Sequence, residues 1–187
     1  MYLGIDLGGT NIKIGCFDSK MNKLAENWLP TQSETNSQTV LANMKRGVHE
    51  LLDNQRVSVS KIQAIGLGVP GLLDIKTGIS KFSPNFNHWD NVPVAEIFQK
   101  EFGVPAFIDN DVRVNLYGEL WQGDTVKNHR NVILITLGTG LGSAITQNGR
   151  VYYGRNFSAG ELGHMNMFRT GGRPCACGST GCLGRYV

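Results

Sequence analysis

A pair of glycines between two short strand-like segments places the strongest constraint on how this chain can fold. Residues 2–6 read as a strand, and apolar and polar side chains alternate over residues 11–17. Gly8 and Gly9 lie between these segments and provide the backbone freedom that a tight turn requires. The two segments are therefore expected to form a β-hairpin, which commits the beginning of the chain to a sheet.

Further strand-like and helix-like segments follow along the chain. Strands are expected at residues 25–29, 62–69, 104–108, 132–137 and 143–146, and helices at residues 38–54, 93–102 and 111–121. Ser37 is the expected N-cap of the first helix. The order β-β-β-α-β-α-β-α-β-β predicts an α/β protein with a mixed sheet flanked by helices. A second strand-rich unit is expected after Gln122, which gives domains at residues 1–122 and 123–187.

Composition and charge exclude several classes of protein. The chain has 187 residues, of which 41% are hydrophobic and 18% charged, so it can bury a core and does not resemble a disordered chain. The formal net charge of +3 is spread along the sequence, so neither nucleic acid nor a membrane surface is expected as a partner. The N-terminus has no basic leader or secretory apolar stretch, and no apolar run is long enough to span a bilayer. The expected location is cytoplasmic.

One glycine-rich segment resembles a dinucleotide-binding loop but is not interpreted as one. Residues 66–71 satisfy the pattern G-x-G-x-x-G and follow an expected strand. A dinucleotide site needs a helix to start at this loop, so that the helix N-terminus faces the pyrophosphate. Pro70 disturbs the loop, and a turn through Thr77 and Gly78 follows instead of a helix. NAD is therefore not expected as a cofactor.

Two other glycine-rich turns are candidates for binding phosphate. The first offers the residues Asp6, Gly8, Gly9, Thr10, Asn11 and Lys13, and the second offers Gly138, Thr139, Gly140 and Gly142. Glycine backbone N–H groups, hydroxyl and amide donors and an ammonium group suit a phosphate, and a carboxylate at the strand end suits Mg²⁺. Either turn alone is typical of an ordinary hairpin. Two such turns, one in each expected domain, indicate a pair that holds a triphosphate.

A carboxylate pair and a polar loop are candidates for substrate chemistry. Asp109, Asn110 and Asp111 follow a strand and open a helix, where aspartate often acts only as a cap. The functional interpretation makes Asp111 the general base for a hydroxyl nucleophile, with Asn110 as a neutral hydrogen-bonding neighbour. The loop at residues 83–86, together with Trp89, fits a hydroxyl-rich ligand and simple loop packing about equally well.

A histidine and three cysteines near the end of the chain have the composition of a zinc site. His164, Cys175, Cys177 and Cys182 fall within nineteen residues, and nearby glycines permit a tight loop. Four protein ligands leave no open position, so such a site would be structural. Clustered cysteines favour a local metal site in an intracellular chain over a secreted disulfide scaffold. Cys16 alternates inward on its expected strand and is assigned to the core.

Taken together, these motifs resemble the ROK family of bacterial sugar kinases, within the actin/hexokinase/Hsp70 superfamily. The resemblance runs from residue 4 to the C-terminus, and its most specific part is His164 followed by C-x-C-G-x-x-G-C at residues 175–182. It implies an actin/hexokinase-like (ribonuclease H-like) two-domain α/β fold, with the C-terminal domain incomplete. It also implies ATP, Mg²⁺ and structural Zn²⁺ as cofactors, a hexose as substrate, and a homodimer.

The resemblance also assigns roles to individual residues. The positions implied to bind the sugar are Gly71, Asn85, Asn110, Asp111, Glu161 and His164. The implied reaction is ATP-dependent phosphorylation of a glucose-like hexose at its primary hydroxyl, with Asp111 as the base. The alternative is a non-catalytic, sugar-binding regulatory member of the family. The repressors of the family carry a helix-turn-helix segment before the first phosphate motif, and no room for one is expected ahead of residue 4.

Two features depart from the family pattern. Gly184 stands where the family normally has a glutamate that accepts hydrogen bonds from sugar hydroxyls, so a lower sugar affinity is expected. Family members also continue well beyond the position of Val187. The chain is therefore expected to be a fragment or a natural truncation, with exposed apolar surface that causes marginal solubility or association. The motifs are shared across hexoses and acetamido-hexoses, so they leave the sugar open.

Overall fold

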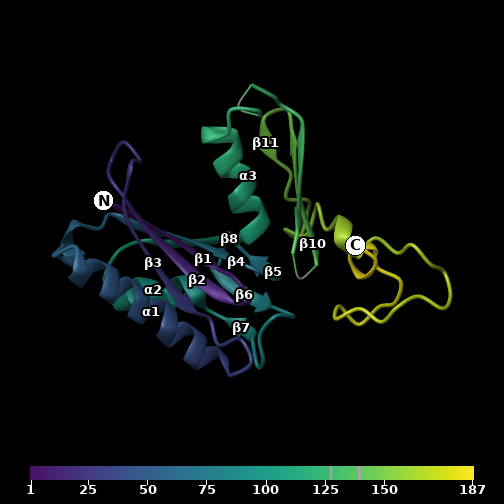
Figure 1. Ribbon diagram of the computed structural model, residues 1–187, viewed down its shortest axis with the longest axis horizontal. Helices are drawn as coiled ribbons and strands as arrows, with labels where there is room; N and C mark the ends of the chain where they lie inside the picture. Colours follow the sequence, from purple (N-terminus) through teal and green to yellow (C-terminus); the bar gives the residue numbers. More distant parts are fainter. Residues whose placement is uncertain (127, 139) are drawn as a thin grey trace. The chain divides into compact units, whose positions relative to one another are not determined.

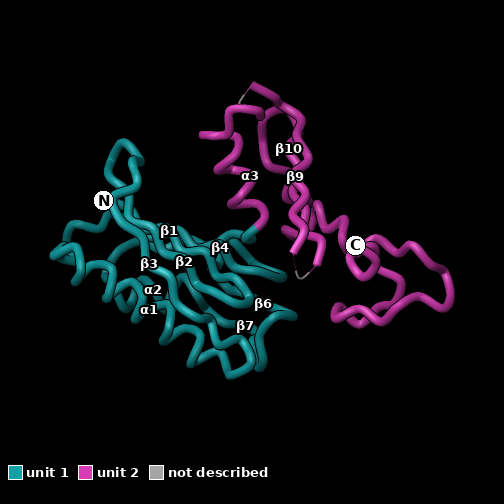
Figure 2. Tube along the Cα trace, viewed as in Figure 1, with its two compact units in different colours: residues 1–111 teal, residues 112–187 magenta. Residues whose placement is uncertain are grey.

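The structure is a computed structural model that describes residues 1–126, 128–138 and 140–187. It divides into two compact units, residues 1–111 (unit 1) and residues 112–187 (unit 2), which are coloured separately in Figure 2.

Unit 1 is built on a five-stranded mixed sheet (Figure 1). In sheet order its strands are β3 (Lys23–Pro30), β2 (Asn11–Phe17), β1 (Tyr2–Leu7), β4 (Ala64–Val69) and β8 (Ala106–Asn110). Strands β1 and β2 form the antiparallel hairpin that the glycine turn and the alternating pattern predict, and β2 also pairs antiparallel with β3. Strands β4 and β8 run parallel to β1, so the carboxyl ends of these three strands lie at one edge of the sheet.

Two amphipathic helices pack against one face of this sheet, α1 (Ser37–Asn54) and α2 (Val94–Phe102) (Figure 1). Their apolar faces are those that the helical spacing predicts, and Cys16 is buried in the same core. The N-cap of α1 is Asn36 rather than Ser37, because the Asn36 side chain accepts a hydrogen bond from the Thr39 backbone N–H at 2.9 Å. The helix therefore begins one residue earlier than expected.

A second, small sheet in unit 1 was not expected from the sequence. Its strands are β5 (Leu72–Asp74), β6 (Ile79–Phe82) and β7 (Asp90–Val92), which are antiparallel neighbours in that order. Trp89 is 1% exposed and donates from Nε1 to Ser80 Oγ at 2.8 Å, and its ring contacts that of Phe86 in a tilted arrangement with the ring centres 4.9 Å apart. The aromatic side chains of this loop therefore anchor it in the core.

All of α3 (Asp111–Gln122) except its first residue lies in unit 2, where the helix packs on a three-stranded antiparallel sheet. The sheet consists of β9 (Val132–Leu137), β10 (Leu141–Gln147) and β11 (Arg150–Val151), with β10 in the middle. A small core joins Val112 and Leu116 to Ala144 and Val151. Because α3 contributes to this core, its residues from Val112 onward belong to unit 2.

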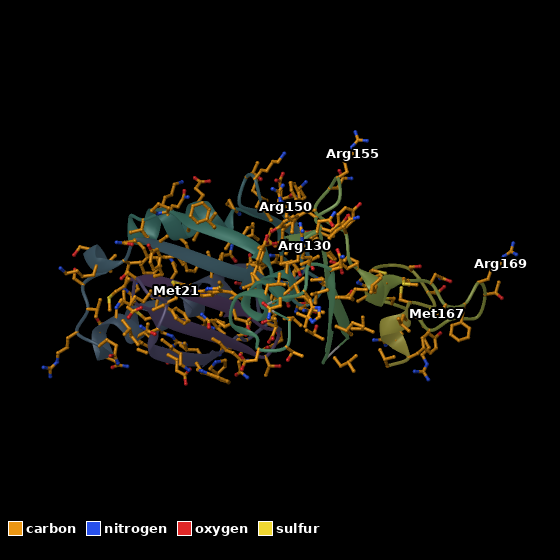
Figure 3. All side chains as sticks on the ribbon, turned by 90° about the horizontal axis from the view of Figure 1, so that it is seen from above. Met21, Arg130, Arg150, Arg155, Met167 and Arg169 are labelled. Carbon is orange, nitrogen blue, oxygen red and sulfur yellow. The ribbon has the colours of Figure 1, made fainter. Side chains whose placement is uncertain are left out.

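The remainder of unit 2 has little regular structure. It contains two short 3₁₀ helices, η2 (Leu162–His164) and η3 (Leu183–Arg185), and the isolated bridges Asn166–Cys182 and Pro174–Thr180. Met167 and Arg169 lie on the loop that leaves η2, and Arg169 points outward (Figure 3). The described part of the chain contains no helix with both the length and the apolar character needed to cross a bilayer.

One side of β9 exposes apolar side chains. Ile133, Ile135 and Leu137 are 59%, 53% and 73% exposed, and within the described residues β9 pairs only with β10. An exposed apolar strand at the edge of a sheet promotes association.

Replacing these three residues together with threonine is expected to shift the isolated chain toward monomer. Threonine keeps β-propensity while it removes apolar surface. Size-exclusion chromatography with light scattering measures the mass of the species in solution. The control is Leu24→Thr, which replaces an exposed apolar residue on β3. An unchanged distribution of species in the triple variant would show that β9 does not drive association.

Candidate active site and metal centre

The first glycine turn, between β1 and β2, has its backbone fixed by unit 1 itself. The Gly8 N–H donates to Asn11 O at 3.1 Å, and a Cβ on Gly8 would lie 2.8 Å from that oxygen. Thr31 donates from Oγ1 to Gly8 O at 2.7 Å and from its N–H to Thr10 O at 2.9 Å. A Cβ on Gly9 would meet nothing within 4 Å, so this turn leaves room for a ligand against its backbone.

Thr31 is a supporting residue that the sequence analysis missed. It is fully buried, and it follows β3 directly. Nothing in the local sequence connects it to the glycine turn, because the contact joins residues 23 positions apart.

Asp6 and Lys13 are cross-strand partners next to this turn. Burial raises the pKa of Asp6, and the positive charge of Lys13 opposes the rise. The Lys13 ammonium lies 4.8 Å from the centre of the Trp28 ring, a cation–π contact across the neighbouring strand. The structure thus brings the expected carboxylate and ammonium together, and Trp28 is a partner of Lys13 that the sequence analysis did not identify.

The parallel strands bring the other unit 1 candidates to the same sheet edge. Asp6 is in register with Gly68, and Gly68 is in register with Asp109. Asn110, 6% exposed, ends β8, and its backbone N–H donates to Asp109 Oδ1 at 2.7 Å. Asp111 then begins α3. Asp111, the expected base, therefore follows the end of β8. Strand β8 lies beside β4, and β4 lies beside β1.

Gly71 occupies a position that only glycine can fill. Its φ is +96°, and a Cβ would clash with the carbonyl oxygen of Phe82 in the small sheet. Asn85, the other unit 1 candidate for sugar binding, is exposed on the loop between β6 and β7. Gly71 therefore lies close to the backbone of β6, and Asn85 lies on an accessible loop.

Gly71→Ala is expected to destabilise the protein by about 2 kcal/mol or more, because the alanine is strained and also clashes. Urea unfolding measures the loss, with Gly66→Ala as the control, since a Cβ on Gly66 meets nothing within 4 Å. Equal midpoints for the two variants would contradict this description of the turn.

The second glycine turn joins β9 to β10 in unit 2. The Gly138 N–H donates to Gly140 O at 3.0 Å, and Leu137 pairs with Leu141. A Cβ on Gly142 would lie 2.6 Å from both Thr136 Oγ1 and Val112 Cγ2, so this glycine allows close packing between β10 and α3. Thr139, which was also expected to bind phosphate, lies outside the described residues.

Glu161 and His164 lie at the two ends of one 3₁₀ turn. The His164 N–H donates to Glu161 O at 3.1 Å, and residues three apart are eclipsed in such a turn. Ser143 on β10 supports the turn, because its hydroxyl donates to Gly160 O and accepts from the Leu162 N–H at 2.9 Å. The turn thus holds the residues of the expected carboxylate and imidazole at its two ends, and Ser143 is a further support that the sequence did not reveal.

The four expected metal ligands form one cluster. One ligand atom from each of His164, Cys175, Cys177 and Cys182 lies within 4.8 Å of the others. Cys175 Sγ is 3.7 Å from His164 Nδ1, and Cys177 Sγ is 3.7 Å from Cys182 Sγ. Tetrahedral Zn²⁺ with its usual bond lengths holds such atoms about 3.5–3.8 Å apart. The arrangement of the four side chains therefore fits a structural zinc ion.

The electrostatics of the cluster also favour a cation. The backbone N–H of Cys177, helped by the neighbouring thiols and His164, lowers the pKa of Cys175 to about 7. Burial and the neighbouring thiols raise the pKa of Cys182 to about 11. Thiolates this close repel one another. A cation among them would remove this penalty.

Gly184, the departure from the family pattern, packs closely in η3. A Cβ at this position would lie 3.3 Å from Gly163 O and from Leu141 N. Gly163 is itself tightly placed, because a Cβ there would clash with Leu141 O. Both glycines bring the segment around His164 close to the start of β10.

Comparison with known proteins identifies the relatives of this chain. It is 36% identical over 183 residues to the glucokinase of Halalkalibacterium halodurans, which covers 97% of this chain and 54% of that protein. It is 33% identical over 196 residues to the N-acetyl-D-glucosamine kinase of Vibrio atlanticus, covering 100% and 63%. The chain thus spans about half the length of the glucokinase and somewhat more of the N-acetyl-D-glucosamine kinase.

The fold comparison agrees with these relatives. A ROK family glucokinase from Streptomyces griseus, solved with glucose and AMPPNP, superposes with a TM-score of 0.86 at 29% identity, covering 99% of this chain and 56% of that one. The similarity confirms the expected α/β fold of the actin/hexokinase type, present here in part. The sequence pattern of the ROK family matches residues 2–187. The chain belongs to the ROK family.

Proposed function

We propose that the protein is an ATP-dependent kinase that phosphorylates a glucose-like hexose at its primary hydroxyl. The observation that carries the proposal is the shared sheet edge in unit 1. There the parallel strands β1, β4 and β8 lead into the glycine turn, Gly71 and Asp111, respectively. A phosphate-binding turn and a carboxylate at one edge of a parallel sheet are the parts that phosphoryl transfer needs.

In this proposal Asp111 accepts the proton of the sugar hydroxyl as its oxygen attacks the γ-phosphoryl group. Asn110 is the neutral hydrogen-bonding neighbour. The transition state of phosphoryl transfer is loose, so positioning and charge neutralisation provide most of the catalysis. The glycine turns and Lys13 bind the phosphates, and Asp6 would hold Mg²⁺, directly or through water. Gly71, Asn85, Glu161 and His164 bind the sugar hydroxyls.

The Cys₃His cluster would hold Zn²⁺ through His164, Cys175, Cys177 and Cys182, and the ion would supply a structural anchor for this loop. His164 offers Nδ1 to the cluster, since this is the atom near Cys175 Sγ. Its Nε2 is then the ring nitrogen left for a sugar hydroxyl, and fixing one nitrogen fixes the orientation of the other. Clustered cysteines that bind a metal are typical of intracellular proteins, where thiols stay reduced, so the proposal places the protein in the cytoplasm. The homodimer is proposed from the family resemblance alone.

A coupled ADP-release assay with Mg²⁺-ATP, run across hexoses and acetamido-hexoses, tests this function. Release of ADP that depends on one sugar is the expected result, and it names the substrate. Calorimetric titration of the same sugars tests binding separately. Sugar binding without ADP release would instead favour the non-catalytic regulatory alternative, and the absence of both would contradict the sugar-binding assignment.

A further inference from the structure

Arg113 is a charged residue in an unusual environment. It lies on α3 two residues after Asp111, and its side chain is only 2% exposed. Among the charged side chains of the described residues, it is the one that is buried. Burial of a guanidinium group costs free energy unless its N–H groups form hydrogen bonds. The contacts of the Arg113 side chain therefore indicate its structural role.

Those contacts hold one loop of unit 2. Arg113 Nη1 donates to the backbone carbonyl of Phe157 at 3.0 Å, and the guanidinium lies 5.1 Å from the centre of the Tyr153 ring. The rings of Tyr153 and Phe157 meet edge to face at 6.2 Å, and the Tyr153 hydroxyl is 3.1 Å from that of Tyr117 on α3. The loop is thus attached to α3 at two points.

The loop needs such support because its backbone is strained. Phe157 has a φ of +58°, in the left-handed region, where a bulky side chain is unfavourable. Such a residue costs on the order of 1–3 kcal/mol and persists only where its surroundings hold it. Arg113 binds the carbonyl of this residue, and the Ala159 N–H closes the loop on Tyr153 O at 3.1 Å. Gly160 and the turn from Glu161 to His164 follow directly.

We propose that Arg113 is a positioning residue for sugar binding: by holding Phe157 in its strained conformation, it fixes the turn that carries Glu161 and His164. The inference rests on the proposed function for the role of those two residues. Arg113 does not itself contact the sugar in this proposal. Its loss therefore weakens the preorganisation of the binding groups, which raises the KM for the sugar more than it lowers kcat.

The test compares Arg113→Met, Arg113→Lys and the control Arg150→Met, which removes an exposed arginine on β11 of the same unit (Figure 3). Hydrogen exchange is measured on the amides of residues 159–164 and on those of β10. Arg113→Met is expected to speed exchange about tenfold in residues 159–164 only. It should also raise the sugar KM about tenfold with kcat within about twofold. Arg113→Lys, which keeps the cation over Tyr153, should recover part of both effects, and Arg150→Met should change neither.

The two readouts separate this proposal from the proposed function. If the wild-type protein binds no sugar, the proposed function fails while the exchange measurement still tests the attachment of the loop. Exchange of residues 159–164 at the wild-type rate in Arg113→Met would overturn the proposal. So would faster exchange with an unchanged sugar KM, or a loss confined to kcat. Arg113→Lys keeps the test informative if the methionine variant does not fold.

Discussion

Asp111→Asn is expected to abolish hexose phosphorylation while hexose binding is largely kept. Asparagine has nearly the same shape as aspartate and still forms hydrogen bonds, but it cannot take the proton of the attacking hydroxyl. General-base catalysis contributes about 10²–10⁴-fold to rates, so kcat should fall by at least about 10²-fold. The sugar affinity should change much less, because the other hydroxyl-binding groups are intact.

The neighbouring carboxylate provides the matched control. Asp109 Oδ1 accepts a hydrogen bond from the Asn110 N–H, and the side-chain oxygen of asparagine can accept it equally well. Asp109→Asn should therefore keep most of the rate. Steady-state assays at saturating hexose, with calorimetry for binding, compare the two variants. An Asp111→Asn protein that keeps most of its kcat would show that another group acts as the base.

Removal of the metal is expected to abolish hexose binding and to unfold the end of unit 2. The segment from residue 165 onward has one 3₁₀ turn and two isolated bridges as its regular structure, and its residues belong to neither hydrophobic core cluster. Structural zinc in small domains contributes about 10–16 kcal/mol of apparent binding free energy at pH 7, which far exceeds what such bridges provide. Without it, the ring of His164 also loses its fixed orientation.

Two variants and a chelator test this expectation. Cys182→Ser removes a buried ligand, whereas Cys16→Ser changes a buried cysteine in the core of unit 1. Metal analysis should find one zinc per chain in the wild type and in Cys16→Ser, and little in Cys182→Ser. Limited proteolysis should cut residues 165–187 of Cys182→Ser and of the chelated protein, and unit 1 should resist. Full hexose binding and protease resistance after complete metal loss would contradict the zinc assignment.

Periodicity explains which parts of the fold could be predicted from sequence. The hairpin of β1 and β2 and the helices α1 and α2 have long, regular patterns, and their positions are confirmed within a few residues. Strands β5 and β7 have only three residues each, too few for alternation to be visible. The packing of α3 against β10 joins residues far apart in the sequence, so the compact unit to which this helix belongs can be read only from the structure.

The distance in sequence between contacting residues explains which residues of the candidate site could be predicted and which could not. The glycine turns and the Cys₃His cluster are each made of residues that are close in sequence, so their spacing alone suggests them as candidates. Thr31, Ser143 and Arg113 act through contacts with residues 23, 17 and 44 positions away. Only the folded structure brings these partners together, and the residues that support a site are therefore harder to predict than those that form it.

Phosphorus-31 NMR of the products formed from Mg²⁺-ATP and the preferred hexose tests the proposed function most directly. The expected product is a phosphomonoester on the primary hydroxyl, formed by the wild-type protein and absent with Asp111→Asn. The 6-deoxy form of the same sugar should bind without being phosphorylated. Formation of inorganic phosphate alone, or of a phosphate ester on another hydroxyl, would contradict the assignment of the protein as a kinase for the primary hydroxyl of a hexose.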